Sequence, residues 1–141
     1  MKIAKGAMKI SAVLAVFWFM PAHAGTNGCS NESLNGKFDV TVAGEIVGTG
    51  PFSVVGRATF DGQGNVSHNI AHIVINGVQP SEDWITGTGS YNVDSDCTGR
   101  IHLVFDNGLT RDVLIVVTKN GHELRGVVAD QGFNAVADGI E

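Results

Sequence analysis

The stretch 101–124 decides the fold, and it reads IHLVFDNGLTRDVLIVVTKNGHEL. Two turn sequences, Asp106-Asn107-Gly108 and Asn120-Gly121, separate runs of β-branched and aliphatic residues. Asparagine and glycine accept the positive φ angles that tight connections between antiparallel strands require. The stretch therefore predicts three consecutive strands joined as two hairpins.

The lengths of the two turns predict which residues face each other, because a shift of one residue moves a side chain to the opposite face of the sheet. A three-residue loop with Gly108 in the left-handed conformation pairs Ile101 with Val113, whereas a two-residue loop would set Leu103 against Asp112. The three-residue loop is therefore preferred. Together with a two-residue turn at 120–121 it predicts the pairs Phe105 with Leu109, Val117 with Leu124, Ile115 with Gly126 and Val113 with Val128. Both turns place the same face of 109–118 inside.

The same rhythm of short apolar runs and turn sequences continues through most of the chain. It predicts eight strands, at 38–47, 52–60, 66–75, 84–93, 99–105, 109–118, 123–129 and 134–140. Only 30–35 has the character of a helical turn. We expect an all-β protein, an eight-stranded antiparallel meander closed into a small barrel, since closure removes unpaired edges. A β-sandwich is the alternative, because strand count alone does not separate the two architectures.

Residues 1–24 have the features of a signal peptide: three lysines, an apolar run and the cleavage sequence Ala22-His23-Ala24. We expect a soluble exported protein, periplasmic or extracellular, without a membrane anchor. Cleavage leaves 117 residues: a segment at 25–36 and a single barrel domain at 37–141. Without the three lysines, six basic side chains stand against 14 acidic ones, a net charge of −8. Such a surface repels phosphate backbones, so no nucleic-acid partner is expected.

Cys29 and Cys97 are the two cysteines of the chain. Export into an oxidising compartment predicts a disulfide between them, which would tie the segment 25–36 to the turn that carries Cys97. The residues lie 68 positions apart, and the chain-entropy model assigns roughly 4 kcal/mol to closing such a loop. Free thiols or a metal site are the alternative, but two cysteines without a Cys-x-x-Cys pattern do not favour it.

Three segments carry a resemblance to known sequences: Gly50-Pro51-Phe52, VGRATFDGQGNVS at 55–67 and GTGSYNVDSDCTG at 87–99. They resemble a group of small exported bacterial β-proteins with the motifs GPFxxVGRxTFDGxGNVS and TGxYxVNxDCTG. Asp94 replaces the usual asparagine, and Gly89-Ser90 replaces the usual Gly-Thr. The group has no established activity, so the resemblance implies export and a β fold. The overall shape is similar to calycin-type and allene-oxide-cyclase-type barrels, an analogy of fold that does not fix function.

The ligand-binding candidates are Phe52, His68, His72, Tyr91, Phe105 and Arg111. On a strand, His68 and His72 are roughly 13 Å apart, too far to share a metal ion, and the sequence does not settle which face they occupy. Arg111 is expected on the inner face opposite Leu103 near a barrel mouth, where it would pair with a ligand carboxylate or lie at the rim. The three aromatic residues would bound a cavity.

Two further features have alternative explanations. Glycines inside strands, at Gly56, Gly87, Gly89 and Gly126, indicate either barrel curvature or close approach by a ligand. The Asp-rich stretches 61–65 and 94–96 have the composition of calcium ligands, but tight turns demand the same residues. We expect turns, no metal and no cofactor.

The sequence lacks the common hydrolase, metalloprotease and nucleotide-binding motifs. It therefore predicts no catalytic residue and does not decide between an enzyme and a binding protein. The first hypothesis is a barrel that binds a small apolar or amphipathic ligand without turnover. The second is a protein-interaction module whose loop 79–83 and Trp84 contact an unidentified partner. The third is a cofactor-free isomerase or cyclase with His68 or His72 as the acid-base group.

Overall fold

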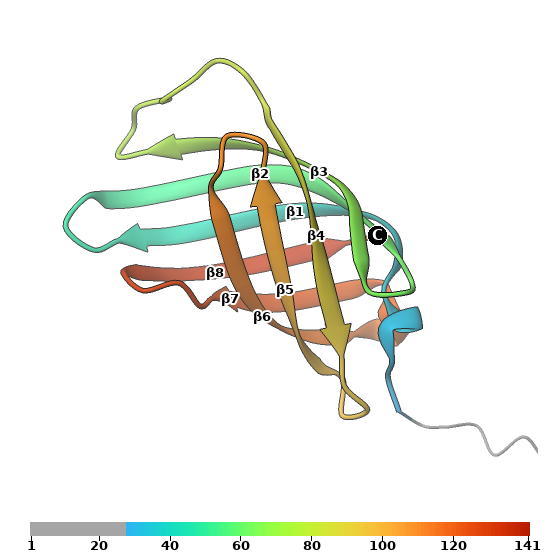
Figure 1. The fold of residues 1–141 in the computed structure, drawn as a ribbon. Coiled ribbons are helices and arrows are strands. Elements are labelled where there is room, and N and C mark those ends of the chain that lie inside the picture. The colour runs from blue at the N-terminus through green and yellow to red at the C-terminus, as the bar shows by residue number, and fades with distance from the viewer. Residues whose placement is uncertain (1–27) are drawn as a thin grey trace, which may run out of the picture.

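A computed structural model describes residues 28–141 except the side chain of Lys119, so the proposed signal peptide lies outside the described residues. The eight strands follow one another around the molecule (Figure 1). They are β1 (Asn35–Ile46), β2 (Gly50–Asp61), β3 (Asn65–Ile75), β4 (Ile85–Val93), β5 (Thr98–Phe105), β6 (Thr110–Thr118), β7 (Glu123–Val128) and β8 (Phe133–Ile140). Two short 3₁₀ turns, η1 (Asn31–Ser33) and η2 (Lys119–Gly121), complete the elements. Among residues 28–141, no helix has the length and apolar character needed to cross a bilayer.

The sheet closes on itself because β1 pairs with β8 as well as with β2. The closing register runs from Asp39 opposite Ile140 to Ile46 opposite Phe133. All neighbouring strands are antiparallel. The predicted barrel is confirmed, and the sandwich alternative is wrong.

The predicted hairpins are confirmed residue by residue. Ile101 pairs with Val113 and Gly108 has a φ of 85°, as the three-residue loop requires. At the next turn Asn120 and Gly121 have φ angles of 57° and 91°, the two positive values of a type I′ turn. The pairs across this turn are Val117 with Leu124, Ile115 with Gly126 and Val113 with Val128.

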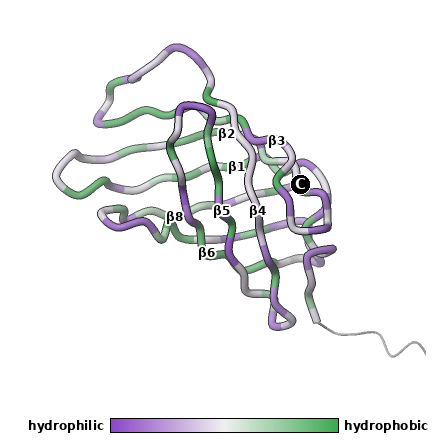
Figure 2. The backbone as a smooth tube through the Cα atoms, in the orientation of Figure 1, coloured by the Kyte–Doolittle hydropathy of each residue, from purple (hydrophilic) through white to green (hydrophobic). Residues whose placement is uncertain are grey.

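Hydropathy follows the topology along the backbone (Figure 2). The connections at the chain reversals are mostly hydrophilic, while the strands carry the hydrophobic residues. Along β6, Val113, Ile115 and Val117 are buried and Leu114 and Val116 are exposed, the period of two expected for a strand with one inner face. Alternation of this kind gives the barrel a continuous apolar interior.

The interior is filled at the end of the barrel where β1 begins and β8 ends, which we call the closed end. Phe38 and Phe60 make an edge-to-face contact with ring centroids 5.2 Å apart, and Phe60 makes a second one with Tyr91 at 5.1 Å. Leu34 and Phe38 are fully buried there. Edge-to-face pairs add roughly 0.5–1.5 kcal/mol each beyond the burial of their surface.

The segment before β1 lies across the closed end. The backbone carbonyls of Asn31 and Leu34 accept hydrogen bonds from the Tyr91 hydroxyl at 3.0 and 2.7 Å. The side-chain oxygen of Asn31 accepts a hydrogen bond from the backbone amide of Val93 at 2.8 Å. The predicted Cys29–Cys97 disulfide is present. It joins this segment to the β4–β5 turn, so the segment is held against the closed end of the barrel.

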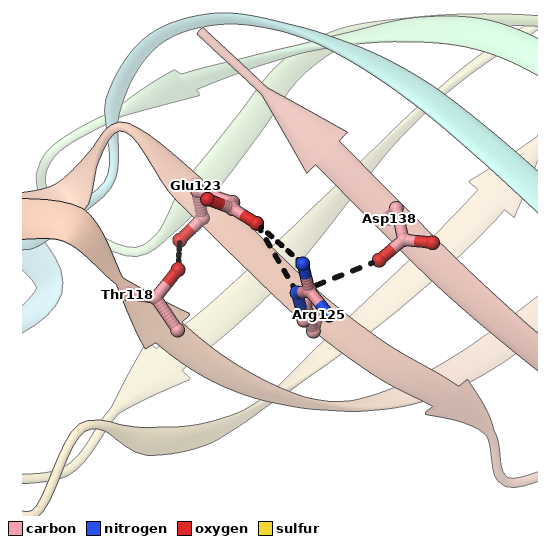
Figure 3. A network of polar contacts seen from close by, with 4 residues as sticks. All are labelled: Thr118, Glu123, Arg125 and Asp138. Atoms are coloured by element: carbon pink, nitrogen blue, oxygen red, sulfur yellow. Dashed lines mark hydrogen bonds and ion pairs between the residues drawn. The ribbon is translucent and has the colours of Figure 1, made fainter.

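A buried carboxylate also lies at the closed end. Glu123 is 8 % exposed and accepts hydrogen bonds from Arg125 Nε and Nη2 at 3.1 and 3.0 Å. Figure 3 shows Arg125 between Glu123 and Asp138, whose carboxylate lies 3.9 Å from Arg125 Nε. Thr118 donates its hydroxyl to the Glu123 backbone carbonyl at 3.1 Å. These contacts tie β6, β7 and β8 together beside η2.

β3 contains a bulge that the sequence analysis did not predict. Thr59 of β2 pairs with His68 and Phe60 pairs with Val66, so Ser67 has no partner on β2. On the other side, Val66 pairs with Gly89 and Asn69 with Gly87. The extra residue changes which side chains face inward, because the alternation restarts after it. As a result Val66 and Asn69 both lie inside.

Candidate functional site

The opposite end of the barrel, which we call the open end, contains a partly enclosed cavity of about 130 Å³. A single water needs roughly 10–15 Å³ of such space, so the cavity corresponds to about ten water-sized positions. Leu109, 45 % exposed, and Arg111, half-buried, lie where it meets solvent. The lining residues are Val40, Val42, Phe52, Val54, Gly56, Asn69, Ala71, Ile73, Ile85, Leu103, Phe105, Leu109, Arg111, Val113, Val128 and Phe133.

The cavity exists because the inner residues are small in the middle of its wall. Gly56 of β2 pairs with Ala71 of β3, and both line the space. At the closed end the corresponding inner positions of these strands hold Phe60 and Val66, which are almost completely buried. Apolar cavities of this size are rare in well-packed interiors, since each missing contact costs dispersion energy. The hollow is therefore a property of the sequence and not of the fold alone.

Asn69 is the uncharged polar side chain in this lining, and it is only 6 % exposed. Its side-chain nitrogen, Nδ2, is buried and has no hydrogen-bond partner among the described residues. A buried donor left unpaired costs about 1–3 kcal/mol. The β3 bulge and the pairing of Asn69 with Gly87 fix the backbone, so the amide stays inside.

Arg111 supplies the charged group of the lining. Its guanidinium carbon lies 4.6 Å from the centroid of the Phe133 ring, a cation–π geometry. Nη1 donates a hydrogen bond to the Thr110 carbonyl at 2.6 Å. Within residues 28–141, Arg111 makes no ion pair with a carboxylate. Within the same residues, four of the five guanidinium hydrogens thus have no hydrogen-bond acceptor.

The structure brings together three of the six residues proposed from the sequence. Phe52, Phe105 and Arg111 line the cavity, and Arg111 faces Leu103 as the hairpin register predicted. Phe133, which the sequence analysis missed, makes an edge-to-face contact with Phe52 at 5.6 Å. Tyr91 lies instead in the aromatic cluster of the closed end, so it does not bound the cavity as expected.

The two histidines lie outside the cavity. His68 is exposed beside the bulge, and His72 lies between Ala71 and Ile73, whose side chains point inward. The His72 ring contacts the ring of Trp84 with centroids 5.3 Å apart, and its Nε2 is 3.2 Å from the Gln79 amide nitrogen. Trp84 is 51 % exposed. This corner is an outer-surface feature at the open end.

The strand glycines allow neighbouring backbones to approach closely. A Cβ atom on Gly87 would lie 2.4 Å from the Val104 carbonyl oxygen, and one on Gly89 would lie 2.2 Å from that of His102. Gly56 and Gly126 would meet backbone oxygens at 2.3 and 2.5 Å. For Gly87, Gly89 and Gly126, which are not part of the cavity lining, these distances favour the curvature explanation, whereas Gly56 combines a close approach to β3 with a place in the lining.

The two Asp-rich stretches use their carboxylates within turns. Asp61 Oδ1 accepts the amides of Gln63 and Asn65, and Oδ2 accepts the Asn65 side chain at 2.7 Å. Hydrogen bonds from Asn65 are the main reason that the pKa of Asp61 lies below its ordinary value. Hydrogen bonds from Thr98 lower the pKa of Asp96 in the same way. Within residues 28–141 no cluster of three metal-ligating side chains occurs.

The fold and the cavity define a small closed antiparallel barrel with an apolar, partly enclosed site that carries one amide and one guanidinium group. Comparisons of the chain with protein-family models, with curated proteins and with solved structures find no match. The chemistry of the cavity is therefore the basis for assigning a function.

Proposed function

We propose that this protein is an exported barrel that binds a small apolar or amphipathic molecule in its open-end cavity without chemical turnover. The observation that carries the proposal is the cavity lining, in which aliphatic, aromatic and glycine residues surround a single amide and a single guanidinium. Ligand sites are typically apolar clefts with a few polar groups that set orientation. The Cys29–Cys97 disulfide is compatible with export, since such bonds persist in oxidising compartments.

Binding is favoured over catalysis because the lining contains no imidazole, carboxylate, thiol or amine. General acid-base catalysis needs such a group within hydrogen-bond reach of the substrate. The isomerase hypothesis assigned this role to His68 or His72, and both lie on the outside. The interaction-module hypothesis depends on Trp84 and the loop 79–83; it stays a prediction, tested by whether Trp84→Ala loses a partner while it still folds.

The experiment uses 1-octanol, a neutral amphipath of about the size that the cavity accommodates. Purified oxidised protein is titrated with octanol while thermal unfolding is followed. A ligand that binds only the folded state raises Tm, by an amount that grows with concentration. We expect such a rise in the wild type.

Two matched variants locate the binding. Ala71→Phe fills the cavity from β3, next to the space left by Gly56, and should abolish the octanol effect. Val55→Phe adds a ring to the 52 % exposed outer face of β2 and should leave the effect intact. Equal responses of both variants, or none in the wild type, would contradict a ligand site in the cavity.

A further inference from the structure

We infer that the ligand of the cavity is a medium-sized carboxylate that carries a second oxygen acceptor, such as a ketone, within its apolar part. This inference rests on the proposed function and adds to it the chemical class of the ligand. Two groups carry it independently: the unpaired amide nitrogen of Asn69 and the guanidinium of Arg111.

Asn69 lacks a hydrogen-bond acceptor for its Nδ2 among residues 28–141. Its Nδ2 is buried, and the other lining side chains are apolar apart from Arg111, itself a donor. A molecule that occupies the cavity can supply this acceptor. Selection against buried unpaired donors is strong, so a native one calls for an explanation. A carbonyl oxygen on the ligand satisfies it, and an alkyl chain does not.

Arg111 favours a planar anion such as a carboxylate. The guanidinium presents its hydrogens in a fixed fork that matches a carboxylate, and its central carbon lies 4.6 Å from the centroid of the Phe133 ring. Its partly buried position reduces screening by solvent, which strengthens an ion pair made there. The chain as a whole has a net charge of −5, so long-range attraction does not favour an anion. Recognition of the carboxylate is thus local to the mouth of the cavity.

The volume limits the length of the molecule. A space of about 130 Å³ accommodates about ten non-hydrogen atoms, by comparison with the volume that one water needs. Medium-chain acids with eight or so carbons match this limit. Sterols and long-chain fatty acids exceed it, so the inference separates this barrel from carriers of large lipids.

The test measures affinities of the oxidised full-length protein by calorimetry for three kinds of probe. The probes are octanoate, the positional isomers of oxo-octanoate, and methyl octanoate. We expect at least one oxo isomer to bind about tenfold more tightly than octanoate, because it pairs with Asn69. We expect octanoate to bind about tenfold more tightly than its methyl ester, because it pairs with Arg111.

Each preference is assigned with one variant and one matched control. Asn69→Leu should remove the preference for the oxo acid and keep the preference for the carboxylate. Arg111→Met, which replaces the unbranched part of the side chain and removes the charge, should do the reverse. Asn134→Leu and Arg100→Met make the same changes at exposed positions on β8 and β5 and should alter neither preference.

The outcomes separate this inference from the function beneath it. If octanol binding is blocked by Ala71→Phe but the wild type shows neither preference, the cavity binds ligands and the assignment of their class is overturned. A preference for oxo acids that survives Asn69→Leu overturns the role of the amide, and a carboxylate preference that survives Arg111→Met overturns that of the guanidinium. If neither octanol nor any acid binds, both the proposed function and the inference fail.

Discussion

The two ends of the barrel are built from the same eight strands with the same alternation, yet one is filled and the other is hollow. At the closed end, Phe38, Phe60 and Tyr91 interlock, and Leu34 seals the interior. At the open end, Gly56 and Ala71 leave space beside Phe52. The two ends also differ in whether their buried polar groups have hydrogen-bond partners. The Tyr91 hydroxyl is hydrogen bonded at the closed end, whereas Asn69 Nδ2 at the open end is not.

This difference indicates a division of labour within one short chain. Interlocked aromatic rings and the disulfide stabilise the fold at one end. The other end can then hold an imperfectly packed interior, at a cost in stability that functional sites commonly carry. The comparison leads to three expectations for the free protein, beginning with the largest effect.

Phe38→Ala should lower the free energy of unfolding by about 3–5 kcal/mol, the usual cost of removing a fully buried phenylalanine. Phe52→Ala should cost at least about 1 kcal/mol less, because Phe52 borders space that already exists and fewer contacts are lost. Urea unfolding of the oxidised proteins measures both values. Equal losses would show that the two ends are packed alike.

Asn69→Leu should stabilise the ligand-free protein by about 1–3 kcal/mol, because it removes an unpaired buried donor and adds apolar surface in the cavity. The same substitution at the exposed Asn134 serves as the control and should change stability little. A destabilising effect at position 69 would mean that the amide is already satisfied in the empty barrel, for example by a buried water.

Tyr91→Phe should cost about 1 kcal/mol near neutral pH through loss of the hydroxyl hydrogen bonds. It should also change the response to alkali. Burial raises the pKa of the Tyr91 hydroxyl, so the unfolded chain loses this proton at lower pH than the folded protein does. The wild type should therefore lose stability as pH rises above about 10.

Unfolding curves collected between neutral and alkaline pH test whether stability falls as the pH rises. Tyr91→Phe should show a smaller loss of stability over the same range, since it lacks the titrating group. The chain has no other tyrosine, which makes the comparison clean. Parallel pH profiles for the two proteins would contradict a buried, hydrogen-bonded hydroxyl.

Much of the fold could be predicted because it is encoded locally. Gly108 in one turn, and Asn120 and Gly121 in the next, supply the positive φ angles, and the apolar period of two then fixes the register. Closure of the barrel could be predicted because eight strands in an open sheet would leave two edge strands unpaired. The start of β1 at Asn35 instead of 38 was missed, because Lys37 and Asn35 give no apolar signal and are ordered by pairing with β2.

The candidate site was predicted less completely, because it depends on the bulge in β3. In a regular strand, Val66 would share a face with His68 and lie on the face opposite Asn69 and Ala71. The sequence does contain a signal: Val66 and the pair Ala71 and Ile73 are all apolar, but their spacing is odd. A change of parity within one strand indicates an inserted residue. Reading it would have placed Asn69 inside and both histidines outside.

The first and last strands of the barrel, β1 and β8, begin and end, respectively, at the closed end. The Glu141 amide donates to the His122 carbonyl there at 3.0 Å. A cargo protein, dye or surface attached through Glu141 would therefore sit on the far side of the molecule from Arg111. Immobilised in this way, the protein would present its cavity to the medium, an arrangement well suited to a biosensor.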